Sequence, residues 1–134
     1  MIRPALALIM FAHGVGYMLW FLPAWVPSAG LVVGRHWMFS SAVLITDPIG
    51  KVFGLVALAV LAGFVGAAWG LFARLPWWEP LAATSAAVGL LVLLVWWSVP
   101  ASGSAIGALV VNLAILAGLR LPSMQPHLNR IIGG

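Results

Sequence analysis

The sequence predicts an all-α integral membrane protein that forms a four-helix up-down bundle. Of its 134 residues, 64% are hydrophobic and only 6% are charged, and the mean hydropathy is +1.17. Soluble domains are about half apolar and about a quarter charged, so this chain cannot cover a water-facing surface with polar side chains. Four apolar segments of spanning length fill most of the sequence, which predicts a single transmembrane domain over residues 1–134.

The first two predicted helices cover residues 4–22 and 48–72. At 1.5 Å per residue, a helix over residues 4–22 is about 28 Å long, which matches the core of a bilayer. We expect it to end at Pro23. The second helix is expected to have Asp47 as its N-cap and Pro48 at its first position, where a missing N–H is harmless.

The third and fourth predicted helices cover residues 80–98 and 103–121. Glu79-Pro80 repeats the acid–proline start of the second helix, and Pro122 ends the fourth. Tryptophan pairs flank the third helix, and an indole prefers the membrane surface because it combines an apolar body with one N–H donor. The residues expected at the membrane surface for this reason are Trp77, Trp78, Trp96 and Trp97.

A longer loop, residues 23–47, joins the first two helices and is too apolar for an ordinary loop. We expect part of it to lie against the membrane. Arg35 and His36 in this loop, together with Lys51, are candidates for contact with lipid headgroups. Asp47 and Lys51 stand four residues apart at a helix start, a spacing that favours an ion pair.

The positive charges predict the orientation of the helices. Arg3, Arg74, Arg120 and Arg130 fall on one side of the predicted membrane, whereas Arg35 and Lys51 fall on the other. Cytoplasmic segments carry the excess of arginine and lysine. The sequence therefore predicts that both termini are cytoplasmic.

Small residues at intervals of four predict close contacts between helices, because lipid supplies no hydrophobic drive for helix association. The residues in these stripes are Ala12 and Gly16 in the first helix, Ala62, Gly66 and Gly70 in the second, and Ser104 and Ala108 in the fourth. Chance spacing in Ala- and Gly-rich segments is the alternative explanation.

Two polar residues are predicted near the middle of the bilayer, His13 in the first helix and Asn112 in the fourth. Unpaired polar side chains are costly there, so a hydrogen bond between the two is expected, with the imidazole neutral. Tyr17 and Trp20 share the face of His13 and could line a slot for a flat lipophilic ring. The pair either locks helix packing or, together with these aromatic residues, binds a quinone, a pigment or a metal.

The composition also argues against several kinds of chemistry. The sequence has no cysteine, which excludes covalent haem attachment, iron–sulfur ligation and thiolate catalysis. Its basic residues are scattered, whereas binding of nucleic acid needs a clustered basic face. The three histidines lie in distant segments and give no metal-ligand spacing. The only acids, Asp47 and Glu79, are predicted on opposite faces of the membrane, so no carboxylate pair is expected.

Phe11-Ala12-His13-Gly14 and the glycine-rich second helix, with Gly54, Gly63 and Gly66, resemble the DoxX-like family of small bacterial four-helix membrane proteins. The resemblance extends to the four-span layout with a longer first loop. It implies the bacterial inner membrane, a redox context linked to quinones and a role as a partner subunit, and it carries over only His13 as a site residue. The sequence departs from that family where Tyr17 and Met18 replace its usual lysine and where Lys51 stands near the family's opening acid.

The function favoured by the sequence is that of a non-catalytic inner-membrane subunit. A chain with two acids, no cysteine and almost no extramembrane mass has little from which to build an active site. Its expected partners are membrane lipids and other membrane protein chains, or further copies of itself. The alternative is a DoxX-like, quinone- or lipophile-binding redox-associated protein with a pocket between the first and fourth helices, at His13, Tyr17, Trp20 and Asn112.

Overall fold

The computed structural model describes residues 2–26, 43–99, 102–126 and 130. Its helices are α1 (Ile2–Gly16), α2 (Met18–Trp25), α3 (Pro48–Phe72), α4 (Trp78–Val95) and α5 (Ser102–Arg120). No β-strand occurs within these described ranges. Four segments are long and apolar enough to cross a membrane, namely Ile2–Trp25, Pro48–Phe72, Trp78–Val95 and Gly103–Arg120. The all-α prediction is confirmed, and four such segments fit a multi-pass membrane protein.

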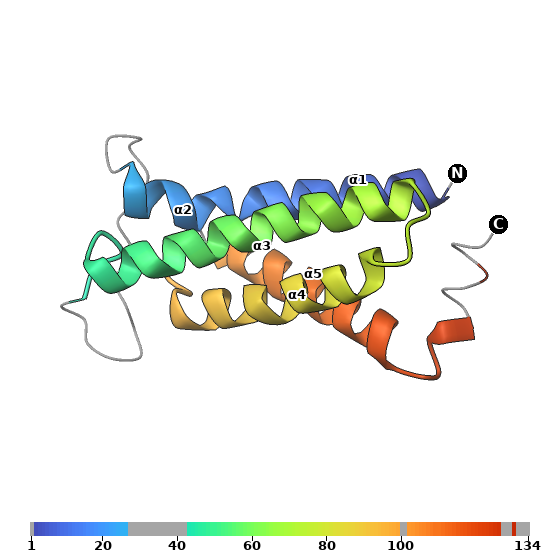
Figure 1. Ribbon diagram of the computed structural model, residues 1–134. Helices are drawn as coiled ribbons and strands as arrows, with labels where there is room; N and C mark the ends of the chain where they lie inside the picture. Colours follow the sequence, from blue (N-terminus) through green and yellow to red (C-terminus); the bar gives the residue numbers. More distant parts are fainter. Residues whose placement is uncertain (1, 27–42, 100–101, 127–129, 131–134) are drawn as a thin grey trace.

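The helices form two layers, with α1, α2 and α3 in one and α4 and α5 in the other (Figure 1). The long α3 occupies the centre, since it packs against α1 and α2 on one side and against α4 on the other. By contrast, α5 makes its main helix contacts with α4. Figure 1 shows that α5 crosses α4 obliquely and diverges from α1 toward its C-terminal end.

The first span differs from the single helix predicted over residues 4–22. It consists of α1 and α2, which meet at Tyr17, where the backbone tightens and Trp20 N–H bonds to the Tyr17 carbonyl at 3.1 Å. Nor does Pro23 end the span, since it lies inside α2, which continues to Trp25. A proline removes one N–H from a helix, and the last turn closes without it because Val26 N–H bonds to the Leu22 carbonyl at 2.7 Å.

The predicted limits of α3 are confirmed at residues 48 and 72, with Asp47 at the N-cap and Pro48 in the first turn. The Asp47 side chain does not cap the helix; instead its Oδ2 accepts a hydrogen bond from Leu44 N–H at 2.8 Å. Lys51 Nζ lies 5.7 Å from the centre of the Trp25 ring, a cation–π distance. These two contacts replace the ion pair predicted between Asp47 and Lys51.

The other two spans begin slightly earlier than predicted. α4 begins at Trp78, so Glu79 lies in the first helical turn and does not cap it, and the helix ends at Val95 instead of residue 98. Pro80 is tolerated because the first N–H groups of a helix have no partner within it. α5 covers residues 102–120, one residue earlier at each end than expected.

The turn between α3 and α4 places Arg74 at the end of the bundle. Arg74 has a φ of 60°, and Leu75 N–H bonds to the Gly70 carbonyl at 2.8 Å. This six-to-one bond and the left-handed residue before it form a Schellman motif, a position that glycine usually occupies. An arginine there costs about 1–2 kcal/mol of backbone energy, but it puts a positive charge beside the helix end.

Candidate functional site

Three polar side chains of the first and fourth spans meet inside the bundle. His13 Nε2 lies 3.3 Å from Asn112 Oδ1. The Asn112 amide nitrogen donates to the Tyr17 hydroxyl at 2.7 Å and to the Ala108 carbonyl at 2.9 Å. The hydrogen bond predicted between His13 and Asn112 is confirmed, and Tyr17 joins it.

The surroundings of Asn112 fix the proton on the imidazole. A backbone carbonyl can only accept, so the Ala108 carbonyl must face the NH₂ group of Asn112. The Asn112 oxygen therefore faces His13, and Nε2 must carry a hydrogen to donate to it. In the neutral ring this leaves Nδ1 as an acceptor.

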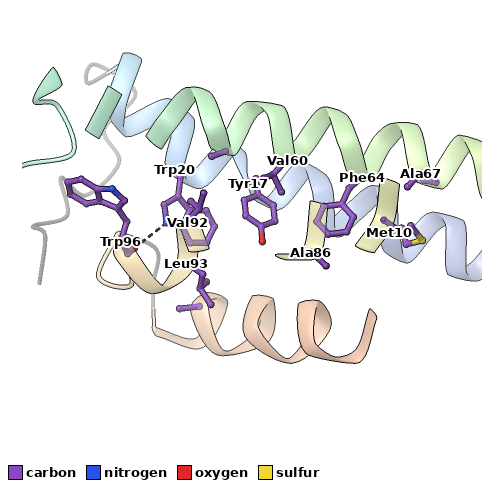
Figure 2. Packing of buried hydrophobic residues seen from close by; sticks show 14 of the residues in the cluster. Met10, Tyr17, Trp20, Val60, Phe64, Ala67, Ala86, Val92, Leu93 and Trp96 are labelled. Atoms are coloured by element: carbon purple, nitrogen blue, oxygen red, sulfur yellow. Dashed lines mark hydrogen bonds between the residues drawn. The ribbon is translucent and has the colours of Figure 1, made fainter. Parts of the chain in front are cut away.

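Aromatic rings close the space around these polar groups. The Tyr17 ring lies between Trp20 and Phe64, with centroid distances of 5.3 Å and 6.0 Å and nearly parallel planes. His13 meets the Phe64 ring edge-on at 4.9 Å. Figure 2 shows Tyr17 between Trp20 and Phe64, with its hydroxyl pointing toward α5. Such pairs contribute about 0.5–1.5 kcal/mol each beyond burial.

Gly89 of α4 provides the room for the Tyr17 hydroxyl. A Cβ at position 89 would occupy the place of that oxygen, would lie 2.7 Å from Tyr17 Cζ, and would approach Asn112 Oδ1 to 3.3 Å. Phe64 and Gly89 were both missed by the sequence reasoning. Nothing in the apolar pattern of α3 or α4 distinguishes them from their neighbours, because their role depends on contacts with other helices.

The four residues predicted to bind a ligand come together, but they leave no slot between them. Tyr17, Trp20 and Asn112 are at most 2% exposed, and Phe64 fills the remaining space beside His13. Trp20 Nε1 donates to the Trp96 carbonyl at 3.2 Å, which the dashed line in Figure 2 marks. The arrangement is that of a packed core with internal hydrogen bonds.

An apolar cavity of about 280 Å³ lies next to this cluster, between the first and fourth spans. None of the four predicted ligand residues lines it. The lining residues are Leu6, Ile9 and Met10 of α1, Leu71 of α3, Trp78 of α4, and Val110, Val111, Ala114, Ile115, Gly118 and Leu119 of α5. The cavity is therefore on the side of the cluster toward the N-terminal end of α1.

The residues predicted at the membrane surface divide into three groups. Lys51 and Trp77 are exposed and Trp97 is half-buried, so their contact with headgroups stays a prediction. Trp96 is completely buried and Trp78 is 8% exposed, so these two tryptophans are core residues. The reason is local packing, since Trp96 lies edge-on to Phe53 and Trp78 meets Gly70. Arg35 and His36, with most of the first loop, lie outside the described residues.

The predicted packing stripes are only partly correct. Gly70 and Gly66 face α4, where added Cβ atoms would lie 2.8 Å from Trp78 Cβ and 3.1 Å from Leu81 Cδ2. Ala108 is half-buried on α5. In contrast, Ala12, Ala62 and Ser104 are exposed, and a Cβ on Gly16 would meet nothing within 4 Å.

Gly14, and not Gly16, is a point of close contact between α1 and α3. A Cβ on Gly14 would lie 2.7 Å from Phe64 Cβ. Gly63 similarly gives room to the Ser85 hydroxyl. The Thr84 hydroxyl donates to the Pro80 carbonyl of its own helix at 2.8 Å.

No group of three or more histidine, cysteine, aspartate or glutamate side chains that could hold a metal ion occurs in the part of the chain that the structure describes. Comparison with protein-family models, with curated proteins and with solved structures finds no match for this chain. The resemblance to the DoxX-like family therefore stays an expectation from the sequence.

Proposed function

We propose that this chain is a non-catalytic subunit of a membrane assembly, and that α5 packs against a transmembrane helix of another chain. The observation that carries the proposal is the outward face of α5. Cβ atoms on Gly103 and Gly107 would meet nothing within 4 Å. Beside them, Ile106 and Leu113 are 54% and 49% exposed.

Two glycines four residues apart on an open helix face let a second backbone approach closely. In lipid, close approach of two backbones contributes more to helix association than exposed apolar area does, because apolar side chains are already surrounded by apolar acyl chains. Ala12 and Gly16 form a similar outward step on α1. The small residues that do not pack inside the chain are thus available for contacts outside it.

The proposal includes an up-down topology with both termini in the cytoplasm of a bacterial cell. Successive spans run in opposite directions in Figure 1, which supports the topology. Arg3, Arg74 and Arg120 stand at one end of the helices and Lys51 at the other. This distribution supports cytoplasmic termini under the positive-inside rule. The bacterial inner membrane rests on the family resemblance.

Mild solubilisation followed by measurement of the mass of the purified particle tests the proposal. A particle that contains a second chain, or more copies of this one, is the expected result. Gly107→Leu should then reduce the associated fraction, because the leucine side chain separates the two backbones. A lone monomer with no co-purifying protein would contradict the proposal.

Ala87→Leu of α4 is the matched control, since Ala87 is also exposed but is followed at position 91 by a leucine. Both variants add a large side chain to an outward helix face. Equal loss of association in the two variants would show that bulk on any lipid-facing surface is sufficient. The assignment of α5 as the interface would then be wrong.

A second candidate function, binding of a lipophilic redox cofactor or pigment, is favoured by the cavity between α1 and α5. Its volume of about 280 Å³ is close to the lower limit of about 300 Å³ for small-molecule sites. Solvent extraction and mass spectrometry of the purified protein test this candidate. A stoichiometric quinone or carotenoid would support it, and phospholipid alone would contradict it.

A further inference from the structure

A small cleft lies between the N-terminal end of α4 and the C-terminal end of α5. Its volume is about 110 Å³, and it is lined by Glu79, Pro80, Ala83, Leu119 and Arg120. Leu119 also lines the apolar cavity between α1 and α5. The residue before Glu79, Trp78, lines that larger cavity as well. A small polar cleft and a larger apolar cavity thus share one wall near the end of α5.

Opposite charges line the small cleft. Glu79 lies in the first turn of α4 and Arg120 in the last turn of α5, and both are exposed. Within the described residues the two side chains form no ion pair with each other. Glu79 is also one of only two acids in the whole sequence. A carboxylate and a guanidinium that share a cleft without pairing can hold a ligand that carries both charges.

We propose that this end of the molecule binds a phospholipid whose headgroup carries a phosphate and a primary ammonium, the phosphatidylethanolamine class. The ammonium enters the cleft beside Glu79, and the phosphate binds the guanidinium of Arg120. One acyl chain occupies the apolar cavity between α1 and α5.

The size of the cleft supports this assignment of the two charges. Since a water molecule takes about 30 Å³ in the liquid, a cleft of about 110 Å³ has room for a few groups of that size, such as the ammonium end of the headgroup. The phosphate then stays at the rim, where an arginine can bind two of its oxygens at once. A choline headgroup fits less well, because its methyl groups replace the N–H donors that a carboxylate accepts.

The apolar cavity helps to position the bound lipid but adds little selectivity among phospholipids. All its lining side chains are apolar, but acyl chains in the surrounding bilayer are equally apolar, so transfer into the cavity gains little hydrophobic free energy. Selection among phospholipids must therefore occur at the headgroup. The prediction is a preference that depends on Glu79 and Arg120.

Native mass spectrometry of the full chain in detergent, with added dioleoyl lipids, tests this proposal. The probes are phosphatidylethanolamine, phosphatidylcholine and phosphatidylglycerol. We expect the wild type to retain phosphatidylethanolamine about two- to five-fold better than either other lipid, the range that one exposed ion pair gives. Glu79→Gln should remove the preference over phosphatidylcholine, and Arg120→Gln should reduce retention of all three lipids.

Arg74→Gln is the matched control, because Arg74 stands at the same end of the bundle but lines neither cavity. It should leave lipid retention unchanged. Equal losses in Arg74→Gln and Arg120→Gln would mean that only the summed positive charge attracts lipid, and would overturn the site. A Glu79→Gln variant that keeps the wild-type preference would also overturn it, since Glu79 would then serve only the end of its own helix. Unfolding of each variant in lipid-free detergent separates lost binding from lost folding.

Discussion

The two ends of the helix bundle differ in packing. At one end, Trp20, Ile45 and Trp96 are at most 2% exposed, and Ala105 of α5 is completely buried among the core residues. At the other end, α1 and α5 are separated by the cavity of about 280 Å³. The hydrogen-bonded cluster at Asn112 stands between the two.

The difference indicates that side-chain volume determines where these helices touch. Large aromatic side chains of α2 and of the residues after α4 fill the first end. At the second end, α5 presents mostly small or branched side chains to α1, including Ala114 and Gly118. Contacts between helices in lipid depend on dispersion and on close approach. The end where the side chains are small therefore keeps a cavity.

The largest expected effect is that of Trp96→Ala at the filled end. Removing this fully buried indole leaves a cavity beside Phe53 and should cost about 3–5 kcal/mol of unfolding free energy. Trp97→Ala, at a half-buried neighbour, should cost clearly less. Unfolding in mixed micelles measures both changes. Equal small losses would contradict the description of Trp96 as a core residue.

A second prediction tests the space that Gly89 provides at the boundary between the two ends. Gly89→Ala forces the Tyr17 hydroxyl out of its place and should cost about 1–3 kcal/mol, the usual effect of overpacking. Gly66→Ala makes the same change where the added Cβ would meet only the end of the flexible Leu81 side chain, at 3.1 Å, and should cost clearly less. Similar values for the two variants would mean that Gly89 is not a point of close contact.

The third prediction concerns the hydrogen bond between His13 and Asn112. His13→Ala leaves the Asn112 oxygen without its donor and should cost about 0.6–2 kcal/mol, the range for such bonds between membrane helices. His13→Gln can restore a donor and should recover most of that loss. A His13→Gln variant as unstable as His13→Ala would show that ring packing on Phe64, and not the hydrogen bond, holds the position.

The sequence predicted the features that depend on local chemistry or on strong penalties. The start of α3 follows from Pro48, whose missing N–H is harmless in the first turn of a helix. The contact of His13 with Asn112 follows from the cost of leaving either polar group unpaired in lipid. Arg74 lies at the same end of the bundle as Arg3, which follows from the opposite directions of the first two spans.

The features that depend on contacts between helices could not be predicted. Trp96 has the sequence position of a residue at the membrane surface, and only the fold buries it against Phe53. Gly14 and Gly16 look equivalent in the sequence, but the face of α1 that meets α3 contains Gly14. The cavity between α1 and α5 likewise depends on the angle at which α5 crosses α4, which no local pattern encodes.

The most direct test of the difference between the two ends uses one substitution at two positions of the same helix. Ala105 is 0% exposed at the filled end, whereas Ala114 lines the cavity. We predict that Ala105→Leu lowers the unfolding free energy by about 1–3 kcal/mol through overpacking. Ala114→Leu should leave it unchanged within about 0.5 kcal/mol, or raise it, because the added methyl groups enter free space. Equal losses at the two positions, measured in the same detergent, would contradict the account, since the α1–α5 end would then be packed as tightly as the tryptophan end.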